Sequence, residues 1–213
     1  MRKTQLAEGN YYHIFNRGVD KREIFSDLID RRRFFQSMDE FNTLDPIGSI
    51  YENFFRDRKK KNKSKKKLVG FVCYCLNPNH YHFILKQLAE RGIEKFMHRL
   101  GVGYTKYFNK RHDRTGVLFQ GAFKAVHIKS NSYLLHLSAY VNLNNHVHSL
   151  GNSVSKSMSS WREYTDNFSE KTFCGKKHVI LDDFKNGEDY RKFAEESLTA
   201  IKDKKELEKL LIE

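Results

Sequence analysis

Two histidines, His80 and His82, stand at the start of the apolar run HYHFILKQ and are the first candidates for chemistry. If this run is a β-strand, side chains two positions apart share a face, so both imidazoles point the same way and Tyr81 points to the other side. Two imidazoles on one face can share a cation. A half-buried strand also accommodates histidine for structural reasons, so the pair alone leaves both interpretations open.

A second group of candidates lies in YLLHLSAYVNLNN, further along the chain. On a helix, Tyr140 and Asn144 lie one turn apart on the same face. An adjacent apolar stripe would pack this helix on a sheet: Leu134, Leu137 and Val141. Tyr140 is then expected at the border between core and cleft, although a core tyrosine is the structural alternative. Tyr133, seven residues before Tyr140, falls on nearly the same face of the helix.

The elements that must position these residues follow from the hydrophobic pattern. Residues 11–18 predict a strand that ends in an Asn-Arg-Gly turn, and residues 26–44 predict a helix with Ser26 as its N-cap. The apolar positions of that helix have helical spacing: Leu28, Phe34, Phe35, Met38 and Phe41. Residues 68–78 and 80–87 predict an antiparallel hairpin joined by a Pro-Asn turn.

The second half of the pattern predicts a helix over 92–116, a strand over 117–129 and a Ser/Asn-capped helix over 130–150. The order β-α-β-β-α-β, followed by the helix that carries Tyr140, is that of an α+β fold, the ferredoxin-like or RRM-like sandwich with an antiparallel sheet. We expect one main domain over residues 1–150. Residues 151–213 predict a mixed C-terminal appendage that ends in a charged helix.

The charge balance points to an anionic partner. The 213 residues carry a formal net charge of +13, and 14% of them are aromatic, so cations and stacking rings are both abundant. The run at residues 56–67 is nearly all cationic and predicts a flexible basic insertion, either a solubilising loop or an arm that neutralises phosphates. The pattern shows no membrane span and no secretion signal, which predicts a cytoplasmic protein. The cysteines, Cys73, Cys75 and Cys174, are expected to be buried and reduced.

Cations interleave with aromatic residues in YTKYFNKRHDR, residues 104–114, which suits a groove that follows a nucleic-acid strand. A core helix with an ordinary charged outer face is the alternative. The candidates for phosphate contacts are Arg17, Lys21, Arg22, Lys106, Lys110, Arg111, Arg114 and Lys124.

Four segments occur in an order that resembles the single-tyrosine HUH transposases, the IS200-like family, and most of all its REP-associated tyrosine transposase branch. They are YYHIFNRGVDKREIFSD, NPNHYHFIL, YTKYFNKRHDRTGVLFQGAFKA and YLLHLSAYVNLNN. The resemblance covers about residues 8–150, and SSWREY at 159–164 is similar to the tail of the same branch.

The resemblance implies a metal-dependent enzyme that nicks and rejoins single-stranded or hairpin DNA through a 5′-phosphotyrosine. It implies Tyr140 as the nucleophile and His80, His82 and Asn144 as ligands of Mg²⁺ or Mn²⁺. Tyr133 is the alternative nucleophile, and the position of Tyr140 one turn from Asn144 favours Tyr140. Asn145 stands where relatives have proline, which loosens the end of the helix. Family members act as monomers or homodimers, and both states remain open here.

Two other functions remain as alternatives. A ferredoxin-like sheet with exposed aromatics also serves non-catalytic modules that bind single-stranded RNA or DNA. A pure binder has no need of Tyr140 beside His80 and His82, which separates the two hypotheses. A zinc hydrolase is disfavoured because no nearby carboxylate supplies a third ligand and a base.

Overall fold

The computed structural model describes residues 4–55, 66–147, 157–168 and 172–210. In this part of the chain a five-stranded sheet has the order β4-β1-β3-β2-β5, and every pairing is antiparallel. The strands are β1 Tyr11–Arg17, β2 Val69–Asn77, β3 His80–Gln87, β4 Lys124–His127 and β5 Met158–Ser159. The order of β1 to β4 is that of the ferredoxin-like sandwich, so the predicted fold class is confirmed.

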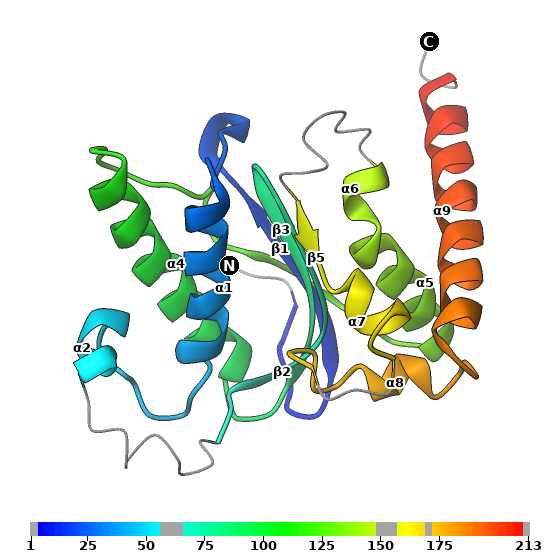
Figure 1. Cartoon of the computed structure of the whole chain (residues 1–213), viewed down its shortest axis with the longest axis horizontal. Coiled ribbons are helices and arrows are strands. Elements are labelled where there is room, and N and C mark those ends of the chain that lie inside the picture. The colour runs from blue at the N-terminus through cyan, green and yellow to red at the C-terminus, as the bar shows by residue number, and fades with distance from the viewer. Residues whose placement is uncertain (1–3, 56–65, 148–156, 169–171, 211–213) are drawn as a thin grey trace.

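Helices cover both faces of the sheet (Figure 1). On one face lie α1 Leu28–Glu40 and α4 Gly92–Arg111, with the short α2 Ile50–Phe55 beyond them and the 3₁₀ turn η1 Val19–Lys21 after β1. On the other face lie α5 Asn131–Asn142, α6 Asn144–Val147, α7 Trp161–Thr165, α8 His178–Leu181 and α9 Gly187–Leu210. The C-terminal segment therefore packs on the helix that carries Tyr140.

Alternation along the strands divides the core in two. Tyr81 and Phe83 pack toward α1 and α4, whereas Ile84 and Cys75 pack toward α5 and α9. Because β2 and β3 are covered on both faces, nearly all of their side chains are buried. The predicted stripe of Leu134, Leu137 and Val141 is buried in the second core. The cysteines are free and buried, as predicted.

Several predicted boundaries are wrong, and helix caps explain part of this. The first helix is capped by Asp27 instead of Ser26, because the Asp27 side chain accepts a hydrogen bond from the backbone N–H of Asp30. Leu28 therefore sits in the exposed first turn, with half of its surface open to solvent. Ser130 caps α5 as predicted and accepts from the N–H of Tyr133.

The region on both sides of Tyr140 also differs from the prediction. The helix predicted over 92–116 ends at Arg111, and of the strand predicted over 117–129 only β4 forms. The helix predicted over 130–150 breaks at Leu143, so Asn144 starts the separate α6. Residues 56–65 of the predicted basic insertion and residues 148–156 lie outside the described residues.

A buried carboxylate joins α1 to the end of α4. Asp30 has no exposed surface, and its oxygens contact Arg111 at 2.5 Å and His112 at 2.9 Å. Arg111 also binds Asp27 at 2.6 Å. This hydrogen bond lowers the pKa of Asp27 to about 2. Arg111, a candidate for a phosphate contact, thus neutralises carboxylates of its own chain.

We expect Arg111→Met to lower the free energy of unfolding, because the buried carboxylate of Asp30 loses one of its two cationic partners and keeps only His112. Urea denaturation at neutral pH measures the decrease. The matched control is Lys110→Met, one position earlier on an exposed face, which should change stability by less than about 0.5 kcal/mol. Equal effects from both variants would show that the ion pair does not hold the helices together.

Candidate active site

The sheet brings the two histidines to one face near the end of β3. In the strand register His80 lies opposite Arg17 of β1 and Asn77 of β2, and His82 lies opposite Phe15 and Cys75. Side chains that face each other across antiparallel strands are neighbours on the same face. The two imidazole rings are 5.2 Å apart between centroids and perpendicular. Tyr81 points into the opposite core, as the alternation predicts.

Hydrogen bonds fix which nitrogen of each ring faces the site. His80 Nδ1 lies 2.6 Å from the side-chain oxygen of Asn79, which only accepts, so Nδ1 carries the hydrogen and Nε2 of the neutral ring keeps a lone pair. Burial lowers the pKa of His80, which favours this neutral form near pH 7. His82 Nδ1 lies 2.9 Å from Nε2 of His13, a buried histidine whose pKa burial lowers to about 4. Each ring is thus held through Nδ1.

The side chains of two buried asparagines lie next to Nε2 of His80. Asn144 Oδ1 lies 3.0 Å from His80 Nε2. Asn77 Nδ2 lies 2.9 Å from the same nitrogen and 2.7 Å from Asn144 Oδ1, so it donates to both. Asn144 Nδ2 is buried and has no hydrogen-bond partner within the described part of the chain. Although Asn144 has left α5, the turn at Leu143 still carries its side chain to His80.

Tyr140 stands over the two histidines from the last turn of α5. Its ring is edge-on to His82 at 5.6 Å between centroids and to His13 at 6.4 Å. Burial raises the pKa of the Tyr140 phenol, and the neighbouring Asn144 side chain opposes this rise. Tyr133 lies in the first turn of α5, where 43% of its surface is exposed. The structure therefore brings Tyr140 to the histidine pair and leaves Tyr133 in solvent.

A cavity of about 640 Å³ opens in front of these side chains. Its lining includes Tyr140, His80 and His82 together with three cations that the sequence singled out: Arg17, Lys21 and Lys124. Positive charge around a small cavity favours a phosphate group. Arg17 also binds the side chain of Gln120, which lines the same cavity.

The other predicted cations lie outside this cavity. Lys106 lines a neighbouring groove of about 730 Å³ between α4 and residues 117–123. Arg114 binds Asn109 and the carbonyl of Val117, and Arg111 binds Asp27 and Asp30. Arg22 and Lys110 are exposed and line none of the cavities found near the sheet in the described part of the chain. For all of these cations outside the cavity, contacts with nucleic acid stay predictions.

Sequence reasoning missed three members of the site: His13, Asn77 and Asn79. All of them stand inside segments that drew attention for other reasons, YYHIFNR and LNPNHYH. A polar residue inside an otherwise apolar strand was the available signal, because a buried polar side chain requires a partner. Asn77 and Asn79 meet His80 across the hairpin turn, whereas the contact of His13 with His82 depends on the pairing of strands that are distant in sequence.

The donor set suits a divalent cation. His80 Nε2 and Asn144 Oδ1 are 3.0 Å apart, the separation of about 3 Å expected for neighbouring corners of an octahedron with bonds near 2.1 Å. The described residues contain no cluster of three or more His, Cys, Asp or Glu side chains that could hold a metal. A site made here would therefore depend on an amide ligand.

The C-terminal segment binds α5 on the side of the helix that faces away from Tyr140. The hydroxyl of Tyr190 on α9 accepts from Asn142 Nδ2 at 2.8 Å and lies 3.1 Å from Ser138 Oγ. Ser138 Oγ already donates to the carbonyl of Leu135, so it accepts from Tyr190. Ser160 Oγ donates to Asn142 Oδ1 at 2.6 Å. Ser138 and Asn142 lie on the side of the helix opposite Tyr140, so these bonds fix its orientation.

We expect Tyr190→Phe to lower the free energy of unfolding by about 2 kcal/mol, because it leaves the buried amide of Asn142 without an acceptor. Chemical denaturation followed by circular dichroism measures the change. Tyr133→Phe removes an exposed hydroxyl from α5 and should be neutral. An unchanged Tyr190→Phe protein would mean that α9 holds α5 through apolar contacts alone.

None of the helices in the described part of the chain is long and apolar enough to cross a membrane. A search of curated proteins finds no match. Among solved structures, the chain is similar to one described as "Structure of the REP associates tyrosine transposase bound to a REP hairpin". The sequences are 15% identical, the TM-score is 0.49, and the match covers 76% of this chain and 83% of the other.

The family comparison concerns most of the sandwich and the tyrosine helix. The family model described as "Transposase IS200 like" matches residues 8–145, which include β1 to β4, α5 and Asn144. The segment from β5 to α9 lies beyond the matched residues. The family that the sequence motifs resemble is thereby confirmed, and the chain belongs to the IS200-like transposases.

Proposed function

We propose that this transposase cleaves and rejoins single-stranded or hairpin DNA with Tyr140 as its nucleophile. The observation that carries the proposal is the position of the Tyr140 phenol beside His80 and His82 in a small cavity lined by cations. A module that only binds nucleic acid has no need of this arrangement. The match over residues 8–145 is to a family of transposases, which supplies the class of reaction.

The reaction is a transesterification at phosphorus. The Tyr140 oxygen attacks the scissile phosphate, a P–O bond to tyrosine forms, and the P–O3′ bond breaks. The products are a 5′-phosphotyrosine and a strand that ends in a 3′-hydroxyl, which takes up a proton. In the reverse sense a 3′-hydroxyl attacks the phosphotyrosine and rejoins a strand. The covalent link conserves the bond energy, so the reaction consumes no nucleotide.

Tyr140 must lose its proton to attack. Burial raises its pKa, whereas the neighbouring Asn144 side chain opposes this rise, so the amide would stabilise the phenolate. Lys124 and Arg17, which line the same cavity, add positive charge near the phosphate. We propose that these side chains and Lys21 neutralise the scissile phosphate and its neighbours. The other candidate cations would contact DNA further from the site.

We propose that His80, His82 and Asn144 hold a Mg²⁺ or Mn²⁺ ion. When bound, such an ion acts as a Lewis acid that polarises the phosphate. Nitrogen ligands suit Mn²⁺ at least as well as Mg²⁺. The chain prepares the site, because Asn79 and His13 hold Nδ1 of the two rings and orient Nε2 for a ligand bond. Asn77, which donates to His80 and Asn144, would have to release them on binding.

We expect Tyr140→Phe to abolish the covalent protein–DNA adduct while the variant still binds DNA, because only the attacking oxygen is removed. Labelled hairpin DNA incubated with the protein and Mn²⁺, followed by a denaturing gel, detects the adduct. Tyr133→Phe is the matched control on the same helix and should form the adduct as the unaltered protein does.

An adduct that persists in Tyr140→Phe and disappears in Tyr133→Phe would reverse the assignment of the nucleophile. If the unaltered protein binds hairpins of varied sequence but forms no adduct with any of them, the chain is a binding module and not an enzyme.

A further prediction concerns His13. We expect His13→Phe to weaken Mn²⁺ binding about tenfold or more, because the Nδ1 hydrogen of His82 loses its acceptor and the ring loses its orientation. Calorimetric titration of the DNA-free protein with Mn²⁺ measures the dissociation constant. His13→Gln offers an amide acceptor and should restore part of the affinity. His178→Phe, an exposed histidine on α8, is the control, and equal affinities across the series would exclude a role for His13.

A further inference from the structure

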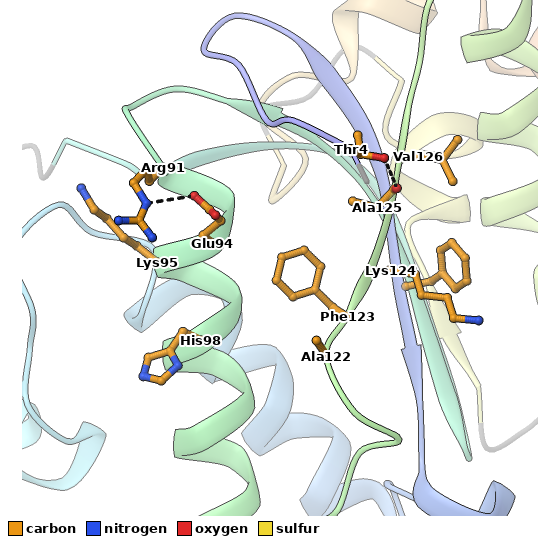
Figure 2. A pocket seen from close by; sticks show the side chains of 11 residues that line it. Thr4, Arg91, Glu94, Lys95, His98, Ala122, Phe123, Lys124, Ala125 and Val126 are labelled. Carbon is orange, nitrogen blue, oxygen red and sulfur yellow. Dashed lines mark hydrogen bonds and ion pairs between the residues drawn. The ribbon is translucent and has the colours of Figure 1, made fainter. Parts of the chain in front are cut away.

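A second and larger cavity lies beside the proposed active site. It has a volume of about 1060 Å³ and lies between α4 and the edge strand β4 (Figure 2). We call it the edge groove, and its main lining residues are Arg91, Lys95, His98, Phe123 and Lys124. Of these five residues, only Lys124 takes part in the proposed chemistry at Tyr140.

The edge groove combines rings with positive charge. Arg91, Lys95 and His98 follow one another at helical spacing along α4, and all three are exposed. Glu94 is the acidic member and pairs with Arg91 Nε at 3.2 Å, so Lys95 and Lys124 keep the balance positive. Figure 2 shows the ring of Phe123 in the space between the helix and the strand. Grooves that bind single-stranded nucleic acid combine the same two features.

The edge groove adjoins the active-site cavity. Phe15 and Lys124 line both of them. Lys124 Nζ lies 5.9 Å from the centre of the Phe15 ring, and Phe15 is stacked on His82 at 5.6 Å. A strand whose phosphate lies at Tyr140 can therefore pass over Phe15 and the edge of β4 without leaving the protein surface.

A nucleic-acid strand fits this surface better than a second protein strand. An added β-strand would need the free backbone groups of β4, but β4 has only four residues, and the Ala125 carbonyl already accepts from the Thr4 hydroxyl at 3.1 Å. Figure 2 shows Thr4 at this edge. The net charge of +13 also opposes close approach of two copies.

We propose that the edge groove binds the unpaired nucleotides that flank the scissile phosphate, with a base stacked on Phe123 and a phosphate near Lys95. The inference rests on the proposed function, because it assigns the path of the DNA that Tyr140 would cleave. Two parts of the DNA would then occupy two different places on the protein. The cavity at Tyr140 takes the reacting phosphate, and the edge groove takes the adjoining single strand.

The test compares hairpin DNA with and without unpaired extensions on either side of the cleavage point, using fluorescence anisotropy for affinity. Phe123→Leu keeps an apolar side chain but removes the stacking surface, so binding of an extended hairpin should weaken about fivefold to a hundredfold. Binding of the blunt hairpin should not change. Phe123→Tyr keeps the ring and should behave as the unaltered protein.

Lys95→Glu provides a surface variant that does not disturb the core. It should weaken binding of the extended hairpin and reduce the slope of log K against log salt by about 0.7 for each phosphate that is no longer neutralised. Lys192→Glu, an exposed lysine on α9, is the matched control for the charge change. If neither extension responds to Phe123→Leu or Lys95→Glu, or if blunt and extended hairpins respond equally, the edge groove does not hold the single strand.

The two proposals fail in different ways. An adduct at Tyr140 with no effect of the groove variants on extended hairpins overturns the inference and leaves the proposed function intact. Extension-dependent binding that requires Phe123, without any adduct, overturns the proposed function and leaves the edge groove as a binding surface. If light scattering shows a dimer that Phe123→Leu dissociates, the groove is an interface between copies and the inference is wrong.

Discussion

The polar side chains on the covered face of a central strand impose the main constraint on this structure. His80 and His82 lie on β3, between β1 and β2 and beneath α5, where a nitrogen without a partner is costly. The hydrogen bonds that satisfy Nδ1 of each ring also orient the rings, and Nε2 of His80 faces Asn144. In the proposed function the same contacts would prepare the rings to bind a metal ion.

Buried polar groups also need partners on the other side of α5, the helix that carries Tyr140. Asn142 and Ser138 are buried polar groups of α5, and their partners come from Tyr190 and Ser160 in the C-terminal segment. This segment lies outside the residues that the family model matches. It nonetheless determines the orientation of the helix that carries Tyr140, so the appendage is part of the support of the site.

The hydrophobic pattern predicted most of the helices and strands, because side-chain alternation in a strand and periodicity in a helix depend only on residues that are near in sequence. Alternation with a period of two identified the hairpin and separated Tyr81 from the two histidines, and the apolar stripe on α5 followed from helical spacing. The ends of the elements were less predictable, because neighbouring residues such as Ser26 and Asp27 can both serve as the N-cap of a helix. The strand predicted over 117–129 was too long, because Phe119 forms only an isolated bridge with Gly18 and Gly121, with φ of 67°, interrupts the extended chain before β4.

The sequence by itself determined which residues could do chemistry: the histidine pair, Tyr140, Asn144 and the family they indicate. Only the tertiary structure decided how they meet. It placed Tyr140 over the pair and left Tyr133 in solvent, and it carried Asn144 to His80 after the helix had ended. The partners of the imidazoles come from other strands and turns. Asn79 contacts His80 within the hairpin turn, but His13 and Asn144 come from segments distant in sequence, and the strand pairing and helix packing that bring them to the imidazoles are not visible in any local pattern.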